Sequence, residues 1–247
     1  MVNFLVNQIY EYSYKCNNVA FYRFIFCYFY DMKKLHALVL GGTGATGQEL
    51  VNLLLENSNF NKVSVFARRS INIKHEKLTT YKIDFTKLED YKQLVIGDVF
   101  FSALGTTRKD AGSKQNQYLV DYTYQYEFAK MASGNGVNLY SLVSSVGANE
   151  KSYFFYPKIK GALENAIMNL DFNKIQIFQP PSLIRQPNLI RYGEQISIAI
   201  LNRLNNIGIL KSFKPLLVHD LAVKMITESL SKTSKDICIY KPKDIYI

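Results

Sequence analysis

Apolar and polar residues alternate along most of the chain in a way that predicts strands followed by helices. Short apolar runs rich in strand-forming residues predict strands within residues 35–40, 62–67, 79–85, 96–104, 137–145 and 174–180. Between several of them, apolar residues recur at helical spacing in residues 46–57, 121–136 and 158–170. Strands that alternate with helices of this length are typical of βαβ units, so we expect a parallel sheet with helices on both faces.

Residues 180–247 follow this alternation less regularly. The proline-broken segment "PPSLIRQPNLIRYGEQ" precedes a predicted helix at residues 218–232 and a short predicted strand at residues 236–240. We interpret residues 32–247 as a single domain, in which residues 180–247 contribute a small C-terminal substrate-side lobe.

Residues 1–31 do not share the pattern of the rest. They are crowded with Tyr, Phe and Asn and follow neither the strand nor the helix period. Because "MKKLHALVLGGTG" from Met32 reads like an ordinary protein start, we favour translated upstream sequence, not native to the protein, for residues 1–31. A membrane-surface anchor and a packed extra element are the alternatives, and no apolar run in the chain is long enough to predict a membrane span.

Length and composition narrow the class of protein. The 247 residues suffice for one large domain, and the net charge of +10 comes from scattered basic residues without a long run, so nucleic acid is not the expected partner. Cys16, Cys27 and Cys238 form no disulfide framework or zinc pattern, and no histidine pair has metal spacing. We therefore expect no metal and a reducing, cytoplasmic location.

A glycine-rich turn, "GGTGATG", joins the first predicted strand to the first predicted helix. Gly41 lets the chain turn sharply, Gly44 lets the backbone approach a pyrophosphate, and Gly47 lets the helix pack close to the strand. The helix then points its positive end at the phosphates. This context predicts a Rossmann-type doubly wound sheet whose turn binds a dinucleotide through Gly41, Thr43, Gly44, Ala45, Thr46 and Gly47.

Two arginines indicate which dinucleotide is bound. Where an NAD-binding protein usually has Asp or Glu at the end of the second strand, this chain has Arg68 and Arg69. Guanidinium groups suit a 2′-phosphate, so we expect NADP(H) to be preferred over NAD(H), with two solvated surface arginines as the alternative. After the third strand, we expect Asp84 and Phe85 to meet the edge and face of the adenine, and an ordinary acidic loop residue is a comparable interpretation of Asp84.

Three polar residues after the fifth predicted strand carry candidate chemistry. Tyr156 and Lys160 are four residues apart and so share one face of a predicted helix, and Ser145 precedes them in "SSVGA". A nearby ammonium favours the phenolate, which prepares Tyr156 as a proton donor to a carbonyl that is being reduced. Ser145 can hydrogen-bond the same oxygen, and Lys160 can also hold the nicotinamide ribose.

Taken together, these motifs resemble the short-chain dehydrogenase/reductase superfamily, in its atypical NAD(P)-binding branch, and within it the Tat-interacting-protein-like group of oxidoreductases. The matching stretches are "GGTGATG", "VFARR", "ALGTTRKDAG", "SSVGA", "YPKIKGALE" and "RYGEQ", and they extend over about residues 34–232. The "LGTTR" and "SSVGA" stretches are typical of the group and not only of the superfamily.

The resemblance implies a Rossmann fold, NADP(H) preference and a catalytic trio of Ser145, Tyr156 and Lys160. It also implies that Leu104, Gly105 and Thr106 lie along the cofactor. Gln179 departs from the group, which often has Arg before the proline. Members of the group are also described as regulators of other proteins, so the resemblance implies a protein partner as well as a small-molecule substrate.

The sequence therefore predicts an NADP(H)-dependent oxidoreductase that reduces a carbonyl or oxidises an alcohol, with Tyr156 as general acid/base. The alternative is an NADPH-binding redox sensor or regulatory protein without significant turnover. A sugar-nucleotide epimerase is disfavoured because the expected substrate lobe is small. Neither the substrate nor the oligomeric state follows from the sequence.

Overall fold

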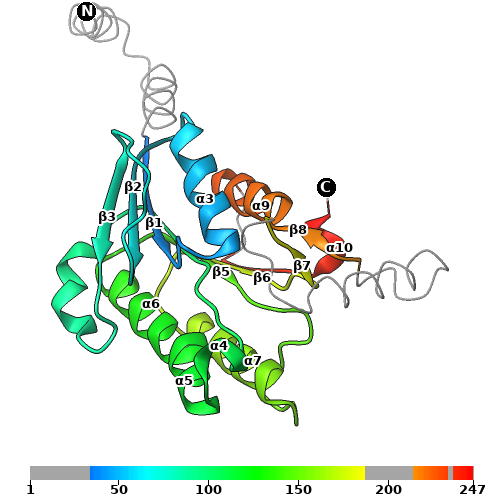
Figure 1. Ribbon diagram of the computed structural model, residues 1–247. Helices are drawn as coiled ribbons and strands as arrows, with labels where there is room; N and C mark the ends of the chain where they lie inside the picture. Colours follow the sequence, from blue (N-terminus) through cyan, green and yellow to red (C-terminus); the bar gives the residue numbers. More distant parts are fainter. Residues whose placement is uncertain (1–33, 187–213, 233–235, 247) are drawn as a thin grey trace, which may run out of the picture. The chain divides into compact units, whose positions relative to one another are not determined.

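Seven parallel strands form the main sheet of the described part of the protein (Figure 1). The computed structural model describes residues 34–186, 214–232 and 236–246. The strand order is β3-β2-β1-β4-β5-β6-β9, and every neighbouring pair is parallel. The strands are β1 (Leu35–Leu40), β2 (Phe60–Ala67), β3 (Leu78–Lys82), β4 (Val99–Ser102), β5 (Leu139–Val143), β6 (Lys174–Phe178) and β9 (Ile237–Tyr240). The predicted doubly wound α/β fold is confirmed.

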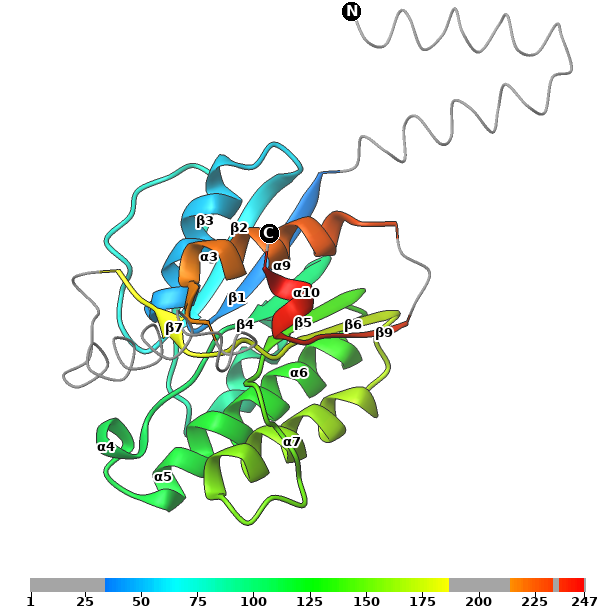
Figure 2. The ribbon, with the colours of Figure 1, turned by 90° about the vertical axis from the view of Figure 1, so that its right-hand side faces the viewer.

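Helices cover both faces of this sheet (Figure 2). The helices α3 (Ala45–Glu56) and α9 (Val218–Leu230) lie on one face, and α6 (Tyr124–Gly134) and α7 (Phe155–Met168) lie on the other. Shorter helical pieces are a 3-10 helix (Leu88–Leu94), α4 (Arg108–Ala111), α5 (Lys114–Tyr118), a π-helical turn (Leu119–Thr123) and α10 (Pro242–Ile245).

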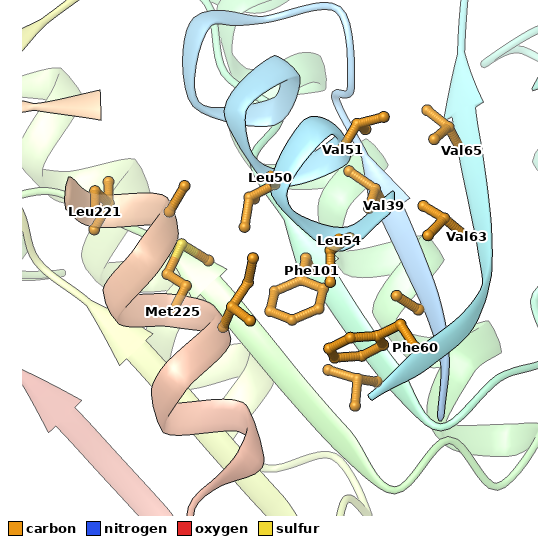
Figure 3. Packing of buried hydrophobic residues seen from close by; sticks show 14 of the residues in the cluster. Val39, Leu50, Val51, Leu54, Phe60, Val63, Val65, Phe101, Leu221 and Met225 are labelled. Atoms are coloured by element: carbon orange, nitrogen blue, oxygen red, sulfur yellow. The ribbon is translucent and has the colours of Figure 1, made fainter. Parts of the chain in front are cut away.

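The first core layer lies between the sheet and the pair α3 and α9. Leu50 and Leu54 of α3 are fully buried against Phe101 of β4, and Leu221 and Met225 of α9 are buried beside them (Figure 3). Both helices carry apolar residues three and four positions apart, which places these side chains on one face of each helix. Their packing fixes the helix that begins at the glycine turn.

Aromatic side chains dominate the second core layer, on the face covered by α6 and α7. Phe128 of α6 packs against Phe66 and Phe100 of the sheet, with ring centroids 5.3 and 6.3 Å apart. Tyr140 of β5 stacks on Phe100 at 5.3 Å, and Leu163 of α7 is fully buried in the same cluster. This layer anchors the inner face of α7, the helix that carries the candidate catalytic residues.

The C-terminal third contributes to the first core layer, to the main sheet and to the edge of the cleft described below. The helix α9 packs on α3 and β9 extends the main sheet, while β7 (Leu183–Ile184) and β8 (Leu216–Leu217) pair as a separate two-stranded sheet. Residues 187–213, which include "RYGEQ", and residues 1–33, on which the interpretations of the N-terminal stretch depend, lie outside the described residues.

Candidate active site

The glycine turn after β1 has the close approaches that its sequence predicts. Gly41 has a positive φ of 86°, and a Cβ added there would lie 2.6 Å from the backbone nitrogen of Leu104. A Cβ at Gly47 would lie 2.1 Å from the carbonyl oxygen of Gly41. The mechanical roles of these two glycines, a sharp turn and close helix packing, are therefore confirmed.

Gly44 differs from Gly41 and Gly47 because the surrounding protein leaves room for a Cβ at this position. A Cβ added at Gly44 would meet its nearest atom, the carbonyl oxygen of Gly41, at an ordinary 3.4 Å. Gly44 is also the N-cap of α3, where no side chain caps the helix. An uncapped helix N-terminus behind an open glycine is the geometry that a pyrophosphate fits, since backbone N–H groups and the helix dipole both favour an anion there.

A cleft of about 880 Å³ opens in front of this turn. It is bounded by Gly44–Thr46 of the turn, by residues 103–110 after β4, and by the first turns of α7. It lies at the carboxyl ends of β1 and β4, where the strand order reverses, which is the usual ligand crevice of a doubly wound sheet. Leu104, Gly105 and Thr106 line it.

Tyr156 and Lys160 both line the cleft, from the first turns of α7. Tyr156 is 40% exposed, so its ring can meet a ligand, whereas Lys160 is buried. The Lys160 ammonium donates a hydrogen bond to the Val143 carbonyl at 3.1 Å. Burial lowers the pKa of Lys160, and the carboxylates of Asp121 and Glu164 oppose that shift.

The two serines after β5 have different surroundings. Ser144 is buried, lines the cleft and donates its hydroxyl hydrogen to a carboxylate oxygen of Glu164. Ser145, the predicted catalytic serine, is half-buried, and its hydroxyl makes a long 3.3 Å hydrogen bond to the Val146 carbonyl. The hydroxyl of Ser144 is thus committed to Glu164, whereas that of Ser145 can reorient at small cost.

The sequence analysis did not predict the role of Glu164, whose buried carboxylate accepts the hydroxyl hydrogen of Ser144. Besides Ser144, the side-chain amide of Gln179 donates to both oxygens of Glu164, at 3.1 and 3.0 Å. Burial raises the pKa of Glu164, against the hydrogen bonds from Ser144 and Gln179 and the charge of Lys160. Gln179 is the position where the resembling group often has Arg, so this chain places a neutral amide against the carboxylate. The i, i+4 spacing of Lys160 and Glu164 in "YPKIKGALE" was the signal that could have found Glu164.

Asp121 is a second acid that the sequence analysis missed. Its carboxylate accepts the backbone N–H of Thr106 at 2.9 Å and so fixes the segment that follows β4. Asp121 is fully buried and lies in the π-helical turn Leu119–Thr123. Such turns insert a residue into a helix and re-aim its neighbours, and periodicity alone does not reveal them.

The residues expected around the adenosine lie beyond β2 and β3. Arg68 and Arg69 follow β2 and are exposed, outside the residues that line the cleft. The Asp84 carboxylate accepts hydrogen bonds from the backbone N–H of Thr86 at 2.9 Å and from its hydroxyl at 2.7 Å, which lower the pKa of Asp84.

Phe85 does not present its ring to a ligand. It is buried in the second core layer, where its ring lies 4.5 Å from that of Tyr124 and 6.2 Å from that of Phe128. The expectation that Phe85 meets the face of an adenine is therefore corrected, because the core already uses both the burial and the stacking surface of this ring.

Comparison with known proteins adds to this geometry. Residues 41–170 match the family model described as NAD(P)H-binding, a range that contains the glycine turn, the post-β4 segment and all of α7. The chain belongs to this NAD(P)H-binding family. This match agrees with the uncapped helix N-terminus at Gly44.

The curated relatives of the chain include a yeast protein and a rat protein. The chain is 35% identical to "Protein FMP52-1, mitochondrial" of Scheffersomyces stipitis, over 72% of this chain and 76% of the relative. It is 32% identical to "Protein HTATIP2" of Rattus norvegicus, over 68% of this chain and 71% of the relative. The second relative confirms the resemblance to the Tat-interacting-protein-like group.

Solved structures agree on the fold. A UDP-N-acetylglucosamine 4-epimerase from Methanobrevibacter ruminantium M1 superposes with a TM-score of 0.63 at 17% identity, covering 85% of this chain and 77% of that one. At this identity the likeness shows a shared Rossmann fold of the short-chain dehydrogenase type and nothing about the reaction.

The relatives contradict the expected location. We expected a cytoplasmic protein, but the names of several yeast relatives include the word mitochondrial. The expectation was wrong because sparse cysteines speak only against an oxidising compartment and do not distinguish one reducing compartment from another. Among the described residues, no helix is both long and apolar enough to span a bilayer.

Proposed function

We propose that this protein is an NADP(H)-dependent oxidoreductase that reduces a carbonyl or oxidises an alcohol, with Tyr156 as general acid/base. The observation that carries the proposal is the placement of Tyr156 and Lys160 one turn apart on α7, where both line the cleft in front of the α3 N-terminus. From the names of its relatives, we infer a mitochondrial location.

The chain offers groups for each part of the dinucleotide. The backbone of Gly44–Thr46 would hold the pyrophosphate, and Leu104–Thr106 would lie along the ribose and nicotinamide. Arg68 and Arg69 would pair with the 2′-phosphate and so favour NADP(H) over NAD(H). When bound there, this cofactor supplies or accepts the hydride.

The protein's own residues manage the proton. Tyr156 donates its hydroxyl proton to the carbonyl oxygen as that oxygen gains negative charge, and it takes the proton back in the reverse direction. Ser145 would donate a hydrogen bond to the same oxygen after its hydroxyl turns from the Val146 carbonyl toward the cleft, whose lining includes the neighbouring Ser144 but not Ser145 itself. Lys160, which also lines the cleft one turn along α7, would favour the phenolate that remains after proton transfer.

The test is Tyr156→Phe, measured as NADPH oxidation over a panel of aldehydes and ketones. The substitution keeps the ring but removes the proton, so turnover should fall by about 10²–10⁴-fold while NADPH affinity stays nearly unchanged. Tyr118→Phe is the matched control, because Tyr118 is also 40% exposed but does not line the cleft.

Two outcomes contradict the proposal in different ways. Full turnover by Tyr156→Phe on a confirmed substrate would show that another group handles the proton. A parent protein that binds NADPH but turns over no carbonyl or alcohol, while NADPH changes its association with another protein, would instead support the regulatory alternative.

A further inference from the structure

Four consecutive aromatic residues at the start of α7 divide between the cleft and the solvent. Phe155 and Tyr156 line the cleft, whereas the side chains of Tyr153 and Phe154 are 104% and 77% exposed. Single exposed apolar residues are common on proteins, but two adjacent and largely exposed aromatic side chains beside a cleft are not explained by the fold.

The loop of residues 149–154, which we name the aromatic tip, is held rigidly. The backbone N–H of Ser152 donates to the Asn149 carbonyl at 2.9 Å, and the backbone N–H of Phe154 donates to the Ser152 hydroxyl at 3.2 Å. The N–H of Asn149 also donates to the Pro157 carbonyl, at 3.0 Å. In both views the loop before α7 projects beyond the neighbouring helices (Figures 1 and 2). Its backbone polar groups are thus tied down while its aromatic side chains face outward.

Lysines surround the aromatic tip. Lys151 lies within it and Lys158 follows it on α7, and both are exposed; the ammonium of Lys114 lies 5.5 Å from the ring centroid of Phe155. Glu150 is the one acid within the tip, and the whole chain carries a net charge of +10. Exposed aromatic rings with adjacent lysines match the interface of an anionic bilayer, where rings enter the headgroup layer and ammonium groups meet lipid phosphates.

We propose that the aromatic tip docks on an anionic membrane surface through Tyr153 and Phe154, with Lys151 and Lys158 against the lipid headgroups. A convex tip suits a fluid bilayer, which needs no matching socket, better than it suits a folded protein partner. Because Phe155 and Tyr156 continue directly into the cleft, docking places the opening of the cleft beside the bilayer. The membrane contact itself does not depend on the proposed reaction.

The sequence offers a direct reporter, because the chain contains no tryptophan. Phe154→Trp introduces a single indole at the tip of the full chain. We expect its emission to shift to shorter wavelength, and to become protected from an aqueous quencher, when vesicles of equal parts phosphatidylcholine and phosphatidylglycerol are added. Ile239→Trp is the matched control, since Ile239 is 43% exposed on β9, and its emission should not change.

A second measurement uses co-sedimentation with the same vesicles. The double variant Tyr153→Ser and Phe154→Ser should lose at least about tenfold in vesicle partition, because two buried rings are removed from the bound state. The pair Ile237→Ser and Ile239→Ser should partition like the parent. NADPH affinity should be the same for all of these variants, which separates a failed docking from a failed cofactor site.

Several results would overturn the proposal. An unchanged emission of Phe154→Trp, even if the protein sediments with vesicles, would place membrane contact elsewhere in the chain. Equal responses to anionic vesicles and to pure phosphatidylcholine would contradict the role of the lysines. A tip that meets no vesicle but is protected in a complex with another protein would assign the surface to a protein partner.

Discussion

The two sides of the cleft differ in the groups that they present: backbone groups on the side of the glycine turn and side chains on the side of α7. The glycine turn presents backbone N–H groups. Its shape depends on Gly41 and Gly47, because a Cβ at either position would clash with nearby backbone atoms. The α7 side presents side chains, and its shape follows from a buried polar network of Lys160, Glu164 and Ser144. One side is fixed by close backbone contacts and the other by contacts between side chains, so the two should fail differently when they are mutated.

The largest expected effect comes from comparing Gly47→Ala with Gly44→Ala, two substitutions that each add one methyl group to the glycine turn. Gly47→Ala should lower the free energy of unfolding by about 3 kcal/mol or more, because its Cβ would lie 2.1 Å from a backbone oxygen that cannot easily move. Gly44→Ala should change the free energy of unfolding by only about 1 kcal/mol or less, since a Cβ at Gly44 would lie at an ordinary 3.4 Å from its nearest atom.

The same pair separates folding from binding. Gly44→Ala should weaken NADPH binding by at least about tenfold, because the methyl group occupies the space where the pyrophosphate would approach. Chemical denaturation and a fluorescence titration of NADPH measure the two effects. If Gly44→Ala binds NADPH like the parent, the turn is a packing feature only.

On the α7 side, Glu164→Ala should lower the free energy of unfolding by about 2–3 kcal/mol. The substitution leaves the buried Ser144 hydroxyl and the Gln179 amide without their acceptor, and Lys160 loses a compensating charge. Glu76→Ala, at an exposed carboxylate, is the control for loss of an acid and should be nearly neutral. A variant as stable as the parent would show that the network adds nothing to the fold.

The choice between NADPH and NADH tests whether the cofactor site extends from the glycine turn to Arg68 and Arg69. The double variant Arg68→Ala and Arg69→Ala should weaken NADPH binding by about tenfold or more and leave NADH binding unchanged, because only NADPH carries the 2′-phosphate. Lys130→Ala, at an exposed lysine of α6, controls for the loss of positive charge. Equal losses for both cofactors would mean that the arginines act through general charge.

Acid should weaken the strand that leads into the glycine turn. Burial, aided by the charge of Lys62 and opposed by Asp98, lowers the pKa of His36 from 6.5 to about 4. The unfolded chain therefore binds this proton more tightly, so the stabilising contribution is complete above pH 6.5 and is lost as the pH falls toward 4.

Because His36 is only partly buried, we expect a loss of about 1–2 kcal/mol over that range. Denaturation of the parent and of His36→Gln at several pH values measures it, and the variant should show a flatter dependence. His75→Gln, at an exposed histidine, should follow the parent. The same slope in all three proteins would contradict the assignment to His36.

The comparison also explains what the sequence could predict. The glycine turn and the placement of Tyr156 and Lys160 one helical turn apart beside the cleft were predictable because each depends on spacing within one short segment. Glu164 and Asp121 were missed because an acid on a helix looks solvated until the packing of α7 and the π-helical turn point it inward. Phe85 was misassigned for the opposite reason, since a strand-end aromatic has the same sequence pattern whether it faces a ligand or the core.

Gly161 allows the start of α7 to pack directly against the backbone of the aromatic tip. A Cβ at this position would lie 2.3 Å from the backbone nitrogen of Glu150, so the helix and the loop touch backbone to backbone with no side chain between them. A side chain at position 161 would separate the loop that carries Tyr153 and Phe154 from the helix that carries Tyr156 and Lys160. The exposed rings of Tyr153 and Phe154 are therefore joined to the cleft-lining Tyr156 through closely packed backbone.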